Sequence, residues 1–220
     1  MRYKDFGKTG EKVSVLCLGT WALGGKQFGA VPEADAISAV HAMVDNGVNI
    51  VDTAPIYASG GSEEVLGKAL EGGYRDKVFL VTKFGSEFVD PNDSDKGTIK
   101  DSSRKNMLKS IEKSLTRLKT DHIDGYLMHW DDRVGTPIEE TIACMHELKD
   151  AGKVRFLGMS NLEQPLADRL LEGGVLDIVQ YPYNMVNRTK EALLMRYAAA
   201  GCGTMGYASL GGGILTGQCR

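Results

Sequence analysis

The feature that most constrains the fold is a repeated alternation between short β-branched runs and longer segments of helical period. This alternation is typical of βα units that build a parallel sheet with helices packed against it. Seven runs predict strands: Val15–Leu18, Val48–Val51, Val78–Thr82, Ile123–Met128, Val154–Gly158, Leu176–Gln180 and Gly203–Tyr207. Six segments predict helices between them: Glu33–Asn46, Glu63–Glu71, Ser102–Lys119, Pro137–Ala151, Glu163–Leu171 and Arg188–Ala200. We therefore expect an α/β fold around a parallel sheet.

Local signals at the helix ends agree with this periodicity. Gly47, Gly152 and Gly201 each follow a predicted helix, at the place where a left-handed residue ends many helices. The segment Thr136-Pro-Ile-Glu139 has the pattern of a capping box with proline at the first helical position. We therefore expect the Thr136 side chain to cap the helix that follows.

Two segments lie outside the βα repeat. Gly7-Lys-Thr-Gly10 separates Tyr3-Lys-Asp-Phe from Lys12-Val-Ser-Val, which predicts an N-terminal β-hairpin that closes one end of a barrel. The longest irregular stretch runs from Phe84 to Lys100 and follows a predicted strand end, where active-site loops belong. It is interpreted either as a substrate-facing flap or as a plain solvent loop.

Composition narrows the class of protein. With 220 residues, of which 42% are hydrophobic, the chain can bury one sizeable core, so we expect a single domain over residues 1–220. A net charge of −3 gives no support for nucleic acid as a partner. No apolar run approaches the roughly 20 residues that cross a bilayer, and the N-terminus lacks a secretory signal. We therefore expect a soluble, cytoplasmic protein that does not contact a membrane.

The cysteines favour neither a metal site nor a disulfide framework. They are widely spaced and form no Cys-x-x-Cys pair: Cys17, Cys144, Cys202 and Cys219. We expect buried, reduced thiols and no bound metal.

Four polar residues stand at or just past the ends of different predicted strands: Asp52, Tyr57, Lys83 and His129. In a parallel barrel the carboxyl ends of the strands gather the chemistry. A hydride added to a carbonyl carbon leaves charge on the oxygen, so a proton donor must point at that oxygen. We predict that Tyr57 is this donor and that the Lys83 ammonium lowers the tyrosine pKa from its free value of about 10. The set therefore predicts carbonyl reduction.

The two remaining members support that pair. Asp52 is expected to hold the Lys83 head and keep it charged, because a lysine on an apolar strand needs a partner. His129 is expected to donate a hydrogen bond to the substrate oxygen or to join the proton relay. Taken singly, Asp52 could equally cap the turn that follows it, and Tyr57 could be an aromatic residue on the rim. The adjacent Asp131 and Asp132 are interpreted as solvated carboxylates, because no histidine converges on them.

The chain resembles the aldo-keto reductases, the NAD(P)H-dependent carbonyl reductases built on a (β/α)8 barrel. The resemblance runs along the whole chain and is carried by eight motifs in the family order: Leu18-Gly-Thr-Trp21, Asp52-Thr-Ala-Pro-Ile-Tyr57, Gly61-Ser-Glu-Glu-Val-Leu-Gly67, Thr82-Lys83, Met128-His129-Trp130, Gly158-Met-Ser160-Asn161, Val179-Gln180 and Leu210-Gly-Gly-Gly-Ile-Leu-Thr-Gly217. It implies that Asp52, Tyr57, Lys83 and His129 form the catalytic set, in agreement with the reasoning from the residues themselves.

The resemblance also supplies a cofactor that the residues alone do not predict, because no strand-to-helix turn here carries a Gly-x-Gly-x-x-Gly. It implies NADP, with NAD possible, and it implies that Ser160, Asn161 and Gln180 hold the nicotinamide carboxamide while Tyr207 stacks on the ring. It further places Thr20, Trp21 and Asp52 beside the cofactor and the small carbonyl substrate. The turn from Leu210 through Gly212 to Gly213 would approach the pyrophosphate, because glycine lets the backbone come close.

The chain departs from the family pattern in three places. Tyr207-Ala-Ser-Leu-Gly211 replaces the usual Tyr-Ser-Pro-Leu-Gly, so Ala208 is not expected to contact the cofactor. Asp131 stands where a proline often follows His-Trp. Seven predicted strands and 220 residues fall short of the roughly 250 residues of such a barrel, so we expect an incomplete barrel lacking its C-terminal part. Its open edge would invite self-association.

Two alternative functions follow from the same residues. The chain could resemble the β-subunits of potassium channels, which bind nicotinamide nucleotide and act through a partner. It could also be an inactive truncated product. Turnover of a generic aldehyde separates the first alternative from an enzyme, and a melting curve with NADPH separates the second, since a specific ligand stabilises only a folded state.

Overall fold

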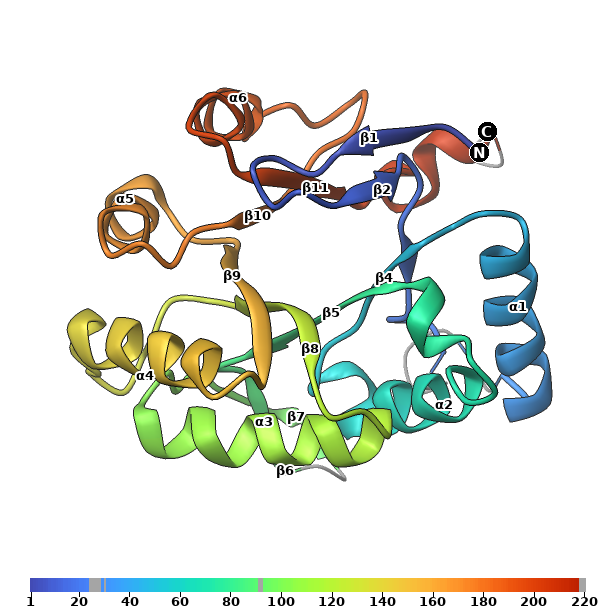
Figure 1. Cartoon of the computed structure of the whole chain (residues 1–220), viewed down its shortest axis with the longest axis horizontal. Coiled ribbons are helices and arrows are strands. Elements are labelled where there is room, and N and C mark those ends of the chain that lie inside the picture. The colour runs from blue at the N-terminus through green and yellow to red at the C-terminus, as the bar shows by residue number, and fades with distance from the viewer. Residues whose placement is uncertain (24–28, 30, 91–92, 218–220) are drawn as a thin grey trace.

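The structure is a computed structural model and describes residues 1–23, 29, 31–90 and 93–217. A sheet of seven parallel strands curls through the centre of the molecule (Figure 1). Across the sheet the strands follow the order β11 (Gly203–Tyr207), β10 (Ile178–Pro182), β9 (Val154–Ser160), β8 (Ile123–Met128), β5 (Phe79–Phe84), β4 (Ile50–Asp52) and β3 (Leu18–Gly19). The fold is therefore the incomplete (β/α)8 barrel that the sequence predicts.

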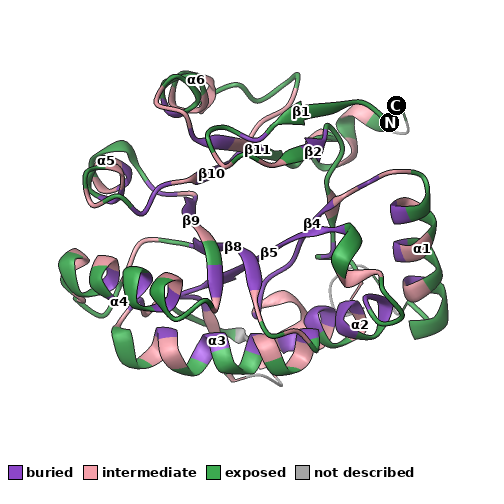
Figure 2. Cartoon of the chain, viewed as in Figure 1, coloured by how far each residue is buried: buried purple, intermediate pink, exposed green. Residues whose placement is uncertain are grey.

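Helices surround this sheet on its outer side (Figure 1). They are α1 (Glu33–Asp45), α2 (Gly61–Ala69), α3 (Arg104–Leu118), α4 (Ile138–Asp150), α5 (Gln164–Glu172) and α6 (Glu191–Ala199). Each helix combines buried and exposed residues (Figure 2). Leu66, Ile111 and Met145 from three of the helices pack with Val51 and Leu80 of the sheet in one core. Burial of such side chains, at about 1.5–3 kcal/mol each, holds the helices on the sheet.

A second core fills one end of the curled sheet. The hairpin of β1 (Tyr3–Asp5) and β2 (Lys12–Ser14) is antiparallel, as predicted, and its Phe6 and Val13 pack with Ile50 and Phe79. The Phe6 and Phe79 rings meet edge to face at 5.4 Å between centroids. Ile50 and Phe79 begin β4 and β5, so the hairpin closes the end of the sheet where the strands start. The hairpin does not cover the opposite end of the sheet, where the strands have their carboxyl ends, so that end can hold a functional site.

The first strand is the main error of the sequence prediction. Val15 and Leu16 are about half exposed and lie outside the sheet, and β3 begins only at Leu18. The Val15 amide instead donates to the carbonyl of Arg2, which continues the pairing of the N-terminal hairpin. The apolar run predicted a strand but could not show which partner its backbone takes. Cys17, expected to be buried, is also exposed, whereas Cys144 and Cys202 are buried and Cys219 lies outside the described residues.

The predicted loop from Phe84 to Lys100 contains regular structure. It forms a two-stranded antiparallel sheet of β6 (Glu87–Asp90) and β7 (Asp93–Ile99). Polar side chains dominate this hairpin, so it lacks the apolar alternation from which strands are predicted.

The cap of α4 also differs from the prediction. Its N-cap is Pro137, with no side-chain cap, and the Thr136 amide is held by Asp132 instead. The predicted helix ends at Gly47, Gly152 and Gly201 are confirmed, because all three glycines adopt positive φ. Among the described residues, no helix is long and apolar enough to cross a membrane.

Candidate active site

The carboxyl ends of three adjacent strands bring the predicted catalytic residues together. Asp52 ends β4, Lys83 is the fifth residue of β5, and His129 directly follows β8. Tyr57 begins the short 3-10 helix η1 (Tyr57–Gly60), which follows β4. Because β4, β5 and β8 are neighbours in the sheet, these side chains meet although they lie far apart in the sequence.

The Lys83 ammonium is at the centre of this cluster. It is fully buried and donates to the Asp52 carboxylate at 2.7 Å, to the Thr53 carbonyl at 2.9 Å and to the Tyr57 hydroxyl at 3.3 Å. Its three N–H donors are thereby satisfied. Burial lowers the pKa of Lys83, but Asp52 and Tyr57 outweigh that effect, so its pKa stands above its ordinary value. The lysine is therefore charged at neutral pH and contacts the tyrosine directly.

The acidity of Tyr57 differs in part from the sequence prediction. Burial raises the pKa of Tyr57, and the Lys83 ammonium lowers it by a smaller amount, so the net shift is upward. Lys83 therefore acts in the predicted direction but against a larger desolvation effect. The resulting hydroxyl stays protonated at neutral pH, as a proton donor must.

A strained turn places Tyr57 above the sheet. Ala58 and Ser59, which follow it, adopt left-handed φ values of 50° and 56°, and Gly60 has φ of 97°. Side chains with a Cβ rarely adopt this conformation, and such strain collects at functional sites. At Gly60 the positive φ would strain any other residue, and an added Cβ would come within 2.4 Å of the Arg117 guanidinium and displace it. The turn therefore holds the hydroxyl over Lys83.

His129 forms the neighbouring wall of the site. It is buried, and its ring stands edge to face with Tyr57 at 6.2 Å between centroids. Burial, the Lys83 charge and the Lys100 charge hold the pKa of His129 well below its usual range. The imidazole is therefore neutral at physiological pH and carries one ring N–H donor in the cavity wall.

The predicted carboxamide-binding residues also form one cluster, on β9, β10 and β11. The Ser160 hydroxyl donates to the Gln180 side-chain oxygen at 2.9 Å, and the Asn161 amide donates to Ser160 at 3.0 Å and to the His129 carbonyl at 3.1 Å. The Tyr207 hydroxyl donates to Asn161 at 2.7 Å. These contacts connect the Lys83 group to the last strand of the sheet.

A cavity of about 550 Å³ joins the two clusters. Nine of the twelve predicted site residues line it, together with five of their neighbours: Gly19, Thr20, Trp21, Ala22, Asp52, Ile56, Tyr57, His129, Trp130, Ser160, Asn161, Gln180, Tyr207 and Ala208. Lys83 lies behind the wall, under Tyr57. Leu210 and Gly212 lie beyond it, at the start of the 3-10 helix η3 (Gly211–Thr216), where Leu210 is exposed.

Sequence reasoning missed four wall residues: Gly19, Ala22, Ile56 and Trp130. Trp130 could have been predicted as a wall residue, because it directly follows His129 at a strand end. No feature of the sequence marked Ile56 as a wall residue. Ala208, which was not expected to contact the cofactor, lines the cavity. Asp132, interpreted as solvated, instead accepts hydrogen bonds from the backbone amides of Ser102 and Thr136, which hold its pKa at about 2 despite burial. It orders the loop after Trp130.

Sequence analysis also overlooked a buried carboxylate behind the site. Glu63 on α2 accepts from the Thr82 hydroxyl at 2.8 Å and pairs with Arg117 at 3.1 Å. Burial raises the pKa of Glu63. Because Thr82 precedes Lys83 on β5, this contact fixes the strand that carries the lysine.

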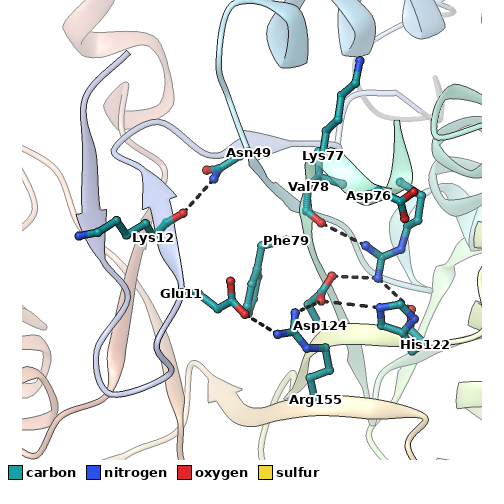
Figure 3. Close-up of a pocket in the computed structure, with 11 residues that line it drawn as sticks. Glu11, Lys12, Asn49, Asp76, Lys77, Val78, Phe79, His122, Asp124 and Arg155 are labelled. Carbon is teal, nitrogen blue, oxygen red and sulfur yellow. Dashed lines mark hydrogen bonds and ion pairs between the residues drawn. The ribbon is translucent and has the colours of Figure 1, made fainter. Parts of the chain in front are cut away.

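A second cavity, of about 280 Å³, lies at the opposite end of the sheet, where the strands begin. In Figure 3, Arg155 reaches between Glu11 and Asp124, whereas the Lys12 and Lys77 ammonium groups point away from this cluster. Arg75 holds the other Asp124 oxygen at 2.9 Å. The buried Asp124 carboxylate is thus paired with two arginines, which is typical of the stabilising end of a βα barrel. In the described part of the chain no cluster of three or more His, Cys, Asp or Glu could hold a metal.

The fold and the site define a class: βα-barrel proteins with a polar site at the carboxyl ends of the strands. Residues 15–220 match the model of the aldo/keto reductase family. Aldo-keto reductase YhdN of Bacillus subtilis (strain 168) is 39% identical over 220 residues, which are 99% of this chain and 65% of that protein. A probable voltage-gated potassium channel subunit beta of Arabidopsis thaliana is 36% identical over 99% of this chain and 66% of its own length.

A solved structure agrees with these relatives. The aldo/keto reductase from Klebsiella pneumoniae, in complex with NADP and acetate, matches 96% of this chain and 70% of its own with a TM-score of 0.78 and 33% identity. The chain belongs to the aldo/keto reductase family, and it spans about two thirds of the length of these relatives.

Proposed function

We propose that this chain carries the active site of a reductase that converts aldehydes or ketones to alcohols with NADPH, or alternatively with NADH. The observation that carries the proposal is the contact of one buried ammonium, that of Lys83, with both the Asp52 carboxylate and the Tyr57 hydroxyl at the wall of a cavity. This arrangement suits proton donation to an oxygen that gains negative charge.

In this proposal Tyr57 donates its proton to the substrate oxygen as the carbonyl carbon is reduced. The phenolate that remains is stabilised by Lys83, which Asp52 keeps charged and in place. Neutral His129 donates a hydrogen bond to the same oxygen and orients the carbonyl. The bound nicotinamide nucleotide supplies the hydride, which no side chain can provide.

The residues on the far side of the cavity suit the nicotinamide. A carboxamide needs both donors and acceptors, and Ser160, Asn161 and Gln180 supply both. Ser160 and Gln180 are almost fully buried beside the cavity, so their polar atoms are already desolvated. We propose that Tyr207 offers its ring face to the nicotinamide ring and that Thr20 and Trp21 lie at the opposite wall.

The glycine turn after β11 suits the pyrophosphate. Gly212 and Gly213 have φ of 66° and 102°, and a Cβ on either would meet nothing within 4 Å. This open backbone leaves room for phosphate oxygens beside Leu210 and Gly212. NADP is proposed as the first choice because the solved relative from Klebsiella pneumoniae was determined with NADP.

The proposal is tested by following NADPH and NADH oxidation with 4-nitrobenzaldehyde, an uncharged substrate, and by identifying the alcohol formed. We expect stoichiometric formation of the alcohol, faster with NADPH. Absence of turnover with both nucleotides, in a chain that binds one of them, would reject the reductase.

A channel-type regulatory subunit is the second candidate, because a relative that is 36% identical carries that name. Such a protein would bind nicotinamide nucleotide and act through a partner. It would give nucleotide binding without useful turnover in the same assay. An inactive protein is the third candidate and would bind neither nucleotide.

We also propose that the chain self-associates through the ends of its sheet. Among the described residues, β3 pairs only with β4 and β11 only with β10, so each has one free edge. Unpaired strand edges are templates for pairing with another chain.

A further inference from the structure

Lys100 places a positive charge against Trp130, a residue of the cavity wall. It follows the last residue of β7, and its carbonyl accepts from the Arg133 amide at 2.8 Å, which joins the hairpin to the loop after β8. The Lys100 ammonium lies 4.5 Å from the centroid of the Trp130 ring. Trp130 lines the cavity, and its ring stacks on that of His129 at 6.0 Å. The ammonium is therefore one ring away from the proposed catalytic imidazole.

This charge is not compensated by a carboxylate. Within the described residues, Lys100 has no acidic group at ion-pair distance, in contrast to Lys83, which is paired with Asp52. The carboxylates adjacent in sequence to Lys100 and to Trp130 do not pair with the Lys100 ammonium. Asp101 accepts from the Ser103 amide, Asp132 accepts from several backbone amides, and Asp131 has a buried side-chain oxygen without a hydrogen-bond partner among the residues that the structure describes. The nearby pair of Lys83 and Asp52 is neutral overall, so it does not offset the charge of the Lys100 ammonium beside Trp130.

The charge acts on the site itself. Besides burial and Lys83, Lys100 is the group that depresses the pKa of His129. Its field therefore reaches the place where the substrate carbonyl would be held. An anionic group of the substrate, lying beside Trp130, would feel the same field with the opposite sign.

We propose that Lys100 selects carbonyl substrates that carry a carboxylate, by holding that carboxylate while the carbonyl faces Tyr57 and His129. This rests on the proposed function. Lys100 is on the β5–β8 side of the cavity, whereas Ser160, Gln180 and Tyr207 come from β9, β10 and β11. The position therefore suits the substrate and not the nucleotide. The cation–π contact with Trp130 fixes the ammonium in advance, which reduces the entropy that binding must remove.

The test compares two aldehydes of nearly the same shape, 4-carboxybenzaldehyde and the uncharged 4-formylbenzamide. Binding is measured by tryptophan fluorescence, because the two tryptophans of the chain, Trp21 and Trp130, both line the cavity. Turnover of both aldehydes is measured in parallel. The variants are Lys100→Met, Lys100→Arg and, as a control with the same loss of charge on exposed α3, Lys105→Met.

We expect the wild type to bind and reduce the carboxylate about tenfold better than the amide, the strength of one hydrogen bond to a charged group. Lys100→Met should remove this preference through a higher KM for the carboxylate, while Lys100→Arg and Lys105→Met retain it. A preference that survives in Lys100→Met would mean that the carboxylate binds elsewhere, for example at Tyr57, and would overturn the inference. If neither aldehyde is reduced by the wild type, the proposed function fails, yet the fluorescence titrations still decide the role of Lys100.

Discussion

At the scale of single residues, the proposed chemistry depends on one ammonium between two oxygens. Lys83 contacts Asp52 at 2.7 Å and Tyr57 at 3.3 Å, and its burial makes both contacts strong. These residue types and their strand-end positions could be predicted from the sequence. The left-handed turn at Ala58 and Ser59 could not, because neither residue type favours positive φ.

Lys83→Met is expected to lower the rate of carbonyl reduction roughly 100-fold or more. Without the ammonium, the pKa of Tyr57 loses its main lowering influence and rises further above its ordinary value. The protonated donor then persists to higher pH, so the alkaline limb of the residual pH–rate profile should move upward. High activity with an unchanged profile would show that the lysine does not tune the tyrosine.

At the scale of elements, sequence periodicity predicted most of the sheet. The predicted bounds Ile123–Met128 and Gly203–Tyr207 match those of β8 and β11. Both strands are continuous runs in the sequence, and turn residues mark at least one end of each. Prediction failed for Val15–Leu18, whose backbone pairs with the N-terminal hairpin, and for β6 and β7, whose polar residues hide the strand pattern. In both cases, strand formation depends on which segment the backbone hydrogen-bonds with, and the periodicity of the sequence does not show that segment.

The charged cluster at the start of the strands joins β5, β8 and β9 to the hairpin. Asp124→Asn should lower the free energy of unfolding by about 3 kcal/mol or more, because the buried carboxylate pairs with both Arg75 and Arg155. Urea denaturation measures this effect. Asp5→Asn is the matched control, since its pair with Lys12 is exposed and should contribute under about 1 kcal/mol. Equal losses in the two variants would contradict a structural role for the cluster.

At the scale of the whole molecule, the sheet ends in β3 on one side and β11 on the other, each with one strand neighbour among the described residues. We expect the 220-residue chain to dimerise or to form larger species in solution, and to bind NADPH more weakly than a micromolar Kd, which corresponds to about −8 kcal/mol. Sedimentation and nucleotide titration measure both properties. A stable monomer that binds NADPH at micromolar concentration or below would refute this expectation.

The central claim, that Tyr57 is the proton donor of a carbonyl reductase, is tested most directly by Tyr57→Phe. The variant removes one hydroxyl and keeps the ring that lies against Trp21 and His129. Reduction of 4-nitrobenzaldehyde and NADPH affinity are measured for this variant and the wild type. The account predicts loss of nearly all turnover with nucleotide affinity largely unchanged, because the hydroxyl acts only in the transition state. Near-normal turnover in Tyr57→Phe would contradict it.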